Sequence, residues 1–190
     1  MVTYYNLTHR FKRSMVEITS ETDYGMLRHY LDPLQNERLP DDVKFEIASG
    51  NRCYDIIRLY ERGEEFYSKK IIEVLSQFVD MTEKCYPIII DGVEEQYYVV
   101  NNLEACPFLN RNESISIDDP CFLEVQDTPL HIFGVENTSF VIVSEEIKNA
   151  LLKKKISNIL LTESFGCTKD EYNKIKKMKF KPKVRFYTEK

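Results

Sequence analysis

One arrangement of apolar and polar positions occurs twice along the chain. In each copy a run of apolar residues precedes a serine, and two further apolar residues follow that serine by three and seven positions, which is helical spacing. The first copy, residues 66–75, contains Ser68, Ile71 and Leu75, and the second, residues 140–151, contains Ser144, Ile147 and Leu151. Each serine predicts the N-cap of a short helix, where its hydroxyl would accept a hydrogen bond from a free amide of the first turn. Because serine caps are common, two ordinary helices that look alike by chance are the alternative to a scaffold unit used twice.

Periodicity and turn residues predict the other elements. A β-hairpin is expected over residues 86–101, because Asp91-Gly92 is a favoured turn pair between two apolar runs. The helix after Ser68 should end near Phe78 and the helix after Ser144 near Lys155. Further strands are expected at residues 4–7, 15–18, 43–47, 121–125, 130–133, 140–143 and 158–162. This order predicts an α+β fold, a mixed and mostly antiparallel sheet with a few short helices packed on it.

The length of 190 residues allows one sizeable core. We divide the chain into an N-terminal segment of short strands and loops, residues 1–42, and an α+β domain, residues 43–190. The domain ends in a basic helix or tail over residues 168–190. We expect the two parts to form one compact unit.

Several signals for compartment and cofactors are missing from the sequence. No apolar run approaches the roughly 20 residues that a membrane span needs, and the first residues lack the order of a secretory signal. The five cysteines are widely spaced, with no Cys-x-x-Cys pair, so we expect reduced thiols. The sequence also contains no glycine-rich phosphate loop and no Gly-x-Ser-x-Gly elbow. We therefore expect a cytoplasmic protein with no membrane contact, no cofactor and no metal site.

The net charge of −5 is distributed unevenly. Residues 169–190 contain nine Lys or Arg and three Asp or Glu, which leaves residues 1–168 with a net charge of −11. An acidic body disfavours nucleic acids and accelerates association with a basic partner. The basic run at residues 174–185 keeps a nucleic-acid-binding module open as an alternative, although such runs are more often solvated helix faces.

Two sets of residues are candidates for chemistry. Cys53 with His29 and Asp55 supplies the residue types of a thiol catalyst, in which a base activates the cysteine. The acidic pairs Asp41-Asp42, Glu64-Glu65, Glu94-Glu95 and Asp118-Asp119 supply carboxylates. Because neighbours in sequence rarely converge on one substrate, we interpret these pairs as exposed rim charges. We name no catalytic residue, and a small thiol enzyme stays as an alternative function.

Four blocks of the sequence resemble the immunity protein eleven family of bacterial polymorphic toxin systems, long catalogued as a domain of unknown function. The blocks are Phe-Tyr-Ser-Lys-Lys-Ile-Ile-Glu-Val-Leu at 66–75, Tyr-Tyr-Val-Val-Asn at 97–101, Ile-Phe at 132–133 and Phe-Val-Ile-Val-Ser-Glu-Glu-Ile-Lys at 140–148. They occur in the order of the family's pattern, and the resemblance covers residues from about 43 to 164.

The resemblance implies a non-catalytic immunity protein that binds and neutralises the effector domain of a cognate toxin. Such a role needs a preorganised surface with aromatic anchors and complementary charge. The candidate toxin-binding residues are Glu94, Glu95, Asp118, Asp119 and Tyr97.

Overall fold

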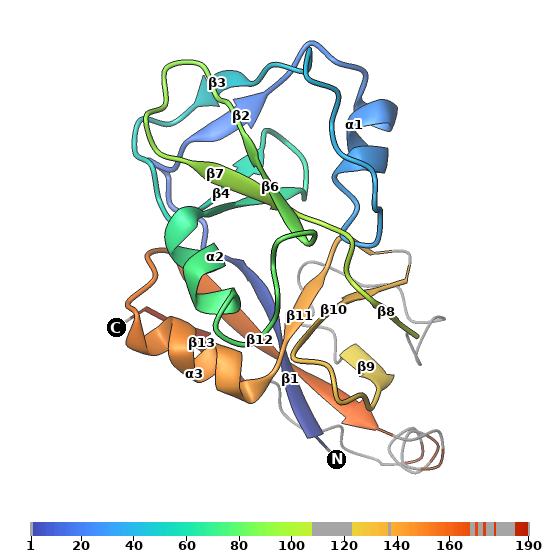
Figure 1. The fold of residues 1–190 in the computed structure, drawn as a ribbon. Coiled ribbons are helices and arrows are strands. Elements are labelled where there is room, and N and C mark those ends of the chain that lie inside the picture. Colours follow the sequence, from blue (N-terminus) through green and yellow to red (C-terminus); the bar gives the residue numbers. More distant parts are fainter. Residues whose placement is uncertain are drawn as a thin grey trace.

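The computed structural model describes residues 2–107, 123–136, 138–167 and 185–189, together with residues 170, 173 and 177. The described residues form two β-sheets and three short helices with assigned bounds, a mostly antiparallel α+β fold as the sequence predicts. The sequence does not indicate the division into two sheets, which lie one above the other in Figure 1.

The first sheet is built around the N-terminal strand. β1 (Val2–His9) pairs antiparallel with β12 (Ile159–Cys167) along its full length and with β11 (Val141–Val143) on its other side. The remaining strands extend this centre, and β8 and β9 are the two that pair in parallel. They are β8 (Ala105–Cys106), β9 (Leu123–Gln126), β10 (Ile132–Val135) and β13 (Phe186–Thr188).

The second sheet curls until its two edges approach each other. Its order is β3-β2-β4-β5-β7-β6, and a bridge between Phe45 and Ile90 joins the chain before β3 to the chain after β6. The amide of Asp91 reinforces this seam by donating to the carbonyl of Phe45 at 2.8 Å between N and O. The strands are β2 (Glu17–Thr19), β3 (Glu46–Ser49), β4 (Ile56–Leu59), β5 (Glu65–Ser68), β6 (Cys85–Ile88) and β7 (Tyr97–Val100).

Two of the three helices cover the first sheet. α2 (Lys69–Leu75) and α3 (Glu145–Lys153) contact each other, lie side by side in Figure 1, and share one hydrophobic core with β1, β11 and β12. The four predicted core positions, Ile71, Leu75, Ile147 and Leu151, are fully buried there. Both helices end before the expected residues, and α1 (Tyr24–Tyr30) was not anticipated from the sequence. No helix among the described residues is long and apolar enough to cross a membrane.

The two serines occupy the predicted N-cap positions, but their hydroxyls do not cap the helices. The Ser68 hydroxyl instead donates to Oδ1 of Asp55 at 2.7 Å, and the Ser144 hydroxyl pairs with Nδ1 of His131 at 3.0 Å. The predicted capping hydrogen bonds are therefore wrong. A nearby carboxylate or imidazole from another strand competes for the hydroxyl, and such partners are invisible in the local sequence.

A polar junction joins the two sheets where β4 begins. The Asn158 side chain, 1% exposed, accepts from the amide of Ile56 at 3.2 Å and donates to its carbonyl at 2.8 Å. Beside it, the Asp55 carboxylate accepts from the amide and the hydroxyl of Ser157 at 2.6 and 2.8 Å. Since Asn158 directly precedes β12, these bonds set the position of the second sheet relative to the first.

A buried lysine anchors α3 to the first sheet. Lys148 is 6% exposed, and its Nζ lies 4.5 and 4.8 Å from the ring centroids of Tyr5 and Tyr187. Burial opposes the charge of Lys148, but the Tyr5 hydroxyl and the Glu145 carboxylate outweigh it and raise the pKa of the ammonium group. The lysine therefore joins β1, α3 and β13 as a cation held between two rings.

The structure confirms the predicted hairpin and shifts one of the predicted strands. The hairpin is confirmed as β6 and β7, with Gly92 at a φ of +77° in its loop. The expected strand at residues 43–47 is displaced to β3, which is largely exposed. Residues 1–42 contribute β1 to the first sheet and β2 to the second, and the expected strand at residues 121–125 is described only from Leu123.

Gly50 and Gly92 provide a matched test of the turns. Both have φ near +78°, where a side chain costs about 1–2 kcal/mol. A Cβ on Gly50 would lie 2.0 Å from the carbonyl oxygen of Met15, whereas a Cβ on Gly92 would meet nothing within 4 Å. Gly50→Ala should therefore reduce the free energy of unfolding in urea by more than Gly92→Ala does, and equal losses would contradict the close approach.

Asn158→Ala tests the junction between the sheets. The substitution leaves the Ile56 amide and carbonyl without their side-chain partner in a buried site, so we expect a loss of about 3 kcal/mol in the free energy of unfolding. Asn149→Ala, on an exposed position of α3, should change it by less than about 0.5 kcal/mol. Chemical denaturation measures both, and a loss below about 1 kcal/mol for Asn158→Ala would argue against the junction.

Candidate functional site

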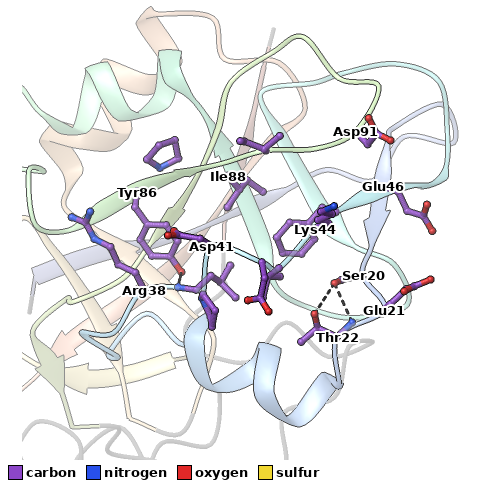
Figure 2. Close-up of a pocket in the computed structure, with 17 residues that line it drawn as sticks. Ser20, Glu21, Thr22, Arg38, Asp41, Lys44, Glu46, Tyr86, Ile88 and Asp91 are labelled. Atoms are coloured by element: carbon purple, nitrogen blue, oxygen red, sulfur yellow. Dashed lines mark hydrogen bonds between the residues drawn. The ribbon is translucent and has the colours of Figure 1, made fainter.

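A groove of about 1040 Å³ lies beside the edge strand β6 of the second sheet. Strand β6, the segment of residues 38–46 and the turn after β2 form its walls, as Figure 2 shows. These three pieces of chain are distant in sequence, and the curling of the sheet brings them together. We call this cavity the acidic groove, for the side chains described below.

A buried tyrosine holds one wall of the acidic groove in place. The Tyr86 hydroxyl accepts from the amide of Leu39 at 3.3 Å and donates to the carbonyl of Tyr30 at 3.4 Å. Burial raises the pKa of Tyr86 to about 12, so the hydroxyl is neutral and able to donate at physiological pH. The segment after α1 is thereby fixed to β6 through Tyr86, although it has no regular secondary structure.

Five carboxylates line the acidic groove without compensation. None of them forms a hydrogen bond or an ion pair through its side chain with any residue that the structure describes. Figure 2 shows Asp41 at one end, near Tyr86, and Glu21, Glu46 and Asp91 at the other. The full set is Glu21, Asp41, Asp42, Glu46 and Asp91. Because like charges within one concave surface add their fields, this groove is a site of negative potential.

Two cationic residues, Arg38 and Lys44, also line the groove. The Arg38 guanidinium is directed elsewhere, since its Nη2 lies 3.6 Å from Oε2 of Glu83 and its Cζ lies 5.8 Å from the Tyr86 ring centroid. Lys44 forms no ion pair within the described part of the chain. The groove therefore keeps a negative balance.

Apolar surface adjoins the negative charge. Ile89 follows β6 and lines the groove, and it is 87% exposed, the largest value among the exposed large hydrophobic side chains described. Phe45 and Ile88 are buried and close the floor of the groove. An exposed isoleucine beside uncompensated carboxylates is a surface on which a basic partner can bury apolar area.

The residues predicted to bind a toxin do not lie together on the surface that the structure describes. Glu94 and Glu95 are exposed and lie in the same loop as Asp91, but they do not line the groove. Tyr97 is 1% exposed, and its hydroxyl donates to the carbonyl of Tyr54, so the proposal of Tyr97 as a surface anchor is wrong. Asp118 and Asp119 lie outside the described residues.

The interpretation of every acidic pair as exposed rim charge is also wrong at one place. Glu64 is 7% exposed and accepts from the Tyr24 hydroxyl at 2.7 Å. Glu65 is half-buried and accepts from the backbone amide of His9 at 3.0 Å, which joins β5 to β1. These carboxylates serve the fold because α1 and β1 supply their donors, whereas Asp41 and Asp42 are exposed as predicted.

The three residues of the thiol hypothesis do not form a catalytic group. His29, Cys53 and Asp55 form no hydrogen bond or ion pair with one another in the described structure, and Nε2 of His29 lies 3.6 Å from Oε2 of Glu37. Burial, together with a hydrogen bond to Glu95, raises the pKa of the Cys53 thiol. A raised pKa lowers the thiolate fraction, which is the opposite of what a nucleophile needs.

A serine, a histidine and a glutamate also meet at the start of α3. The Ser144 hydroxyl lies 3.0 Å from Nδ1 of His131, and Oε2 of Glu146 lies 3.9 Å from the same nitrogen. In a catalytic triad the serine and the acid bind opposite ring nitrogens. Since both partners here share Nδ1, the arrangement cannot relay a proton in that way.

No three His, Cys, Asp or Glu side chains in the described ranges are arranged to hold a metal ion. The basic run at residues 174–185 falls almost entirely outside the described residues.

Sequence reasoning missed the acidic groove itself. Its only local signal was the pair Asp41-Asp42, because Glu21 and Asp91 become neighbours of that pair only in the folded chain.

Comparisons with known proteins do not identify the chain. No protein-family model matches the sequence, and no curated protein matches it.

The reactivity of Cys53 tests the thiol hypothesis. At neutral pH we expect iodoacetamide to modify Cys53 more slowly than an unperturbed thiol, and Glu95→Gln should accelerate the reaction because it removes the charge that opposes the thiolate. Cys85, whose pKa is also raised by burial, should be unaffected by this substitution. Mass spectrometry of the alkylated protein gives both rates, and fast modification of Cys53 would revive the thiol hypothesis.

Proposed function

We propose that this protein is a non-catalytic immunity protein that binds and neutralises the effector domain of a cognate bacterial toxin. The observation that carries the proposal is the acidic groove, with its five uncompensated carboxylates and the exposed Ile89. A basic partner surface would restore the missing counter-charges and bury the isoleucine. Long-range attraction between such surfaces accelerates association, and apolar contact slows dissociation.

The resemblance to immunity proteins supports the same function from a different direction. All four blocks contribute side chains to the core that α2 and α3 share with the first sheet, for example Tyr67, Val100, Ile132 and Val141. The acidic groove draws on other parts of the chain, residues 20–22, 38–46 and 86–91. Such a division would let a common scaffold carry a binding surface suited to one particular toxin.

The cysteines and the acidic groove bear on the compartment and on the two alternative functions. We place the neutralisation in the cytoplasm, in keeping with Cys53 and Cys85, which form no disulfide among the described residues. The thiol enzyme is the weaker alternative, because the pKa of Cys53 is raised. The negative groove likewise disfavours a nucleic-acid-binding module.

Coexpression tests the proposal directly. The protein is expressed in bacteria with the toxin C-terminal domain encoded immediately upstream of its gene, and growth and copurification are followed. We expect growth to be restored and a stoichiometric complex to be recovered. Continued toxicity with no complex, while the toxin is expressed and active, would contradict the immunity function.

Charge reversal then locates the interface. Asp41→Lys with Asp42→Lys should weaken the complex by roughly tenfold or more at low salt, since both side chains are exposed in the groove. Glu73→Lys, on an exposed position of α2, is the matched control and should leave affinity unchanged. Glu94→Lys with Glu95→Lys tests the other exposed acidic pair. Calorimetry gives the affinities, and an effect confined to Glu94 and Glu95 would move the interface away from the groove.

A further inference from the structure

Strand β3 is an edge strand of the second sheet. Among the described residues it pairs with β2 alone, and the seam at the Phe45–Ile90 bridge joins the chain just before it, so the seam covers the edge at its start and leaves residues 46–49 without a strand partner on that side. Residues 46–48 are exposed, including Ile47 at 41%. The opposite edge strand, β6, contains Pro87, which has no amide to donate to a further strand. The sequence of β3, Glu-Ile-Ala-Ser, contains no proline or lysine, and Glu46 is its one charged residue, so β3 is the less protected of the two edges.

The two ends of the β2–β3 pair carry opposite charge. At one end lies the acidic groove, which includes Glu21 after β2 and Glu46 at the start of β3. At the other end lies a second, shallower cavity of about 760 Å³, formed by the chain before β2 and the turn after β3. Lys12 and Arg13 line it together with Phe11, and no acidic side chain does. We call this second cavity the basic pocket.

The basic pocket is preorganised and exposed. Phe11 is 58% exposed, and the Arg52 guanidinium lies 5.0 Å from the ring centroid of Tyr54 on the pocket wall. The amides of Asn51 and Arg52 both donate to the carbonyl of Ser14, which fastens the turn after β3 to the chain before β2. Lys12 is paired with Glu189, with 3.0 Å between Nζ and Oε1, but Arg13 has no ion pair with a described residue. Arg13 is therefore available to a partner, and the exposed Phe11 ring has the Arg58 guanidinium over it, with Cζ 5.2 Å from the ring centroid.

We propose that an extended segment of the protein partner adds to β3 as a further strand, with Lys or Arg at the groove end and Asp or Glu at the basic-pocket end. The proposal rests on the proposed function, because it specifies how the partner occupies the acidic groove. Backbone hydrogen bonds along β3 would supply affinity, and the two charged ends would set the register. Since a strand rises about 3.3 Å per residue, the four residues of β3 place the two charged ends roughly four to six residues apart.

Charge at both ends selects this occupant over the alternatives. A nucleic-acid strand would suit the basic pocket, but the five carboxylates of the groove would repel it. A uniformly basic segment would suit the groove and be repelled by Arg13. Only a polypeptide can carry both signs at this spacing and also pair its backbone with β3.

Synthetic peptides test this mode of binding without altering the protein. The probe is a fluorescent peptide of about ten residues, with two lysines at one end, alternating valine and threonine in the middle, and two glutamates at the other end. The control has the same composition but carries one lysine and one glutamate at each end. Fluorescence anisotropy at low salt should show roughly tenfold tighter binding of the probe.

Backbone methylation separates strand addition from simple charge attraction. Alternate amides of an added strand face β3, so N-methylation of one alternating set should abolish binding, whereas methylation of the other set should leave it intact. Hydrogen exchange of residues 46–49 should slow when the probe binds. Equal binding of probe and control, no binding of either, or indifference to both methylation patterns would overturn strand addition.

The outcome is distinguishable from failure of the immunity function. If strand addition fails while Asp41→Lys with Asp42→Lys still weakens the toxin complex, the acidic groove stands and only the mode of binding is wrong. Arg13→Glu adds a second readout, since it should weaken binding of the probe by several-fold, whereas Lys153→Glu on the exposed end of α3 should not.

Discussion

The arrangement of this protein depends on one set of buried hydrogen bonds, those of Asn158 and Asp55 between the two sheets. One hydrophobic core contains side chains of both sheets and a second lies within the second sheet, but apolar contact alone is non-directional. The Asn158 amide can satisfy the backbone of Ile56 in only one relative position of β4 and β12. The backbone of Asn158 has a φ of +49°, which asparagine tolerates better than most residues do. The hydrogen bonds of the side chain and the backbone conformation therefore both favour asparagine at position 158.

The position of the second sheet determines what its surface can do. With the junction fixed, the sheet curls around a core of its own, and its edges meet at Phe45 and Ile90. The acidic groove and the basic pocket lie at opposite ends of the β2–β3 pair, away from the helices that cover the first sheet. In the proposed function, the helices and the first sheet would form the scaffold, and the second sheet would offer the binding surface. This separation is consistent with an inhibitor whose partner contacts differ from its fold determinants.

The parts of the fold that could be predicted from the sequence are those governed by local spacing. Ile71, Leu75, Ile147 and Leu151 are buried because helical periodicity alone places them on one face. The hairpin of β6 and β7 follows from its turn residues. The serine hydroxyls and the buried Glu64 escaped prediction because their partners come from other segments of the chain, 13 to 40 residues away in sequence.

The burial of Tyr97 and the acidic groove could not be predicted from the sequence either, because both depend on contacts between distant segments. An aromatic residue in an alternating strand is equally compatible with either face of a sheet, and only the curl of the second sheet turns Tyr97 inward. The carboxylates of the acidic groove come from three separate segments, so no sequence window contains them together. The sequence shows that these carboxylates exist, but only the tertiary structure brings them together in one groove.

The seam between Phe45 and Ile90 has a consequence for how binding and folding are linked. The two edges of the second sheet meet there through a single bridge, and the acidic groove has walls on both sides of it. A partner that contacts both walls would hold the seam closed and favour the folded state by mass action. At a free partner concentration of one hundred times Kd this linkage is worth about 2.7 kcal/mol. The abundance of the partner would then set the lifetime of the protein as well as its occupancy.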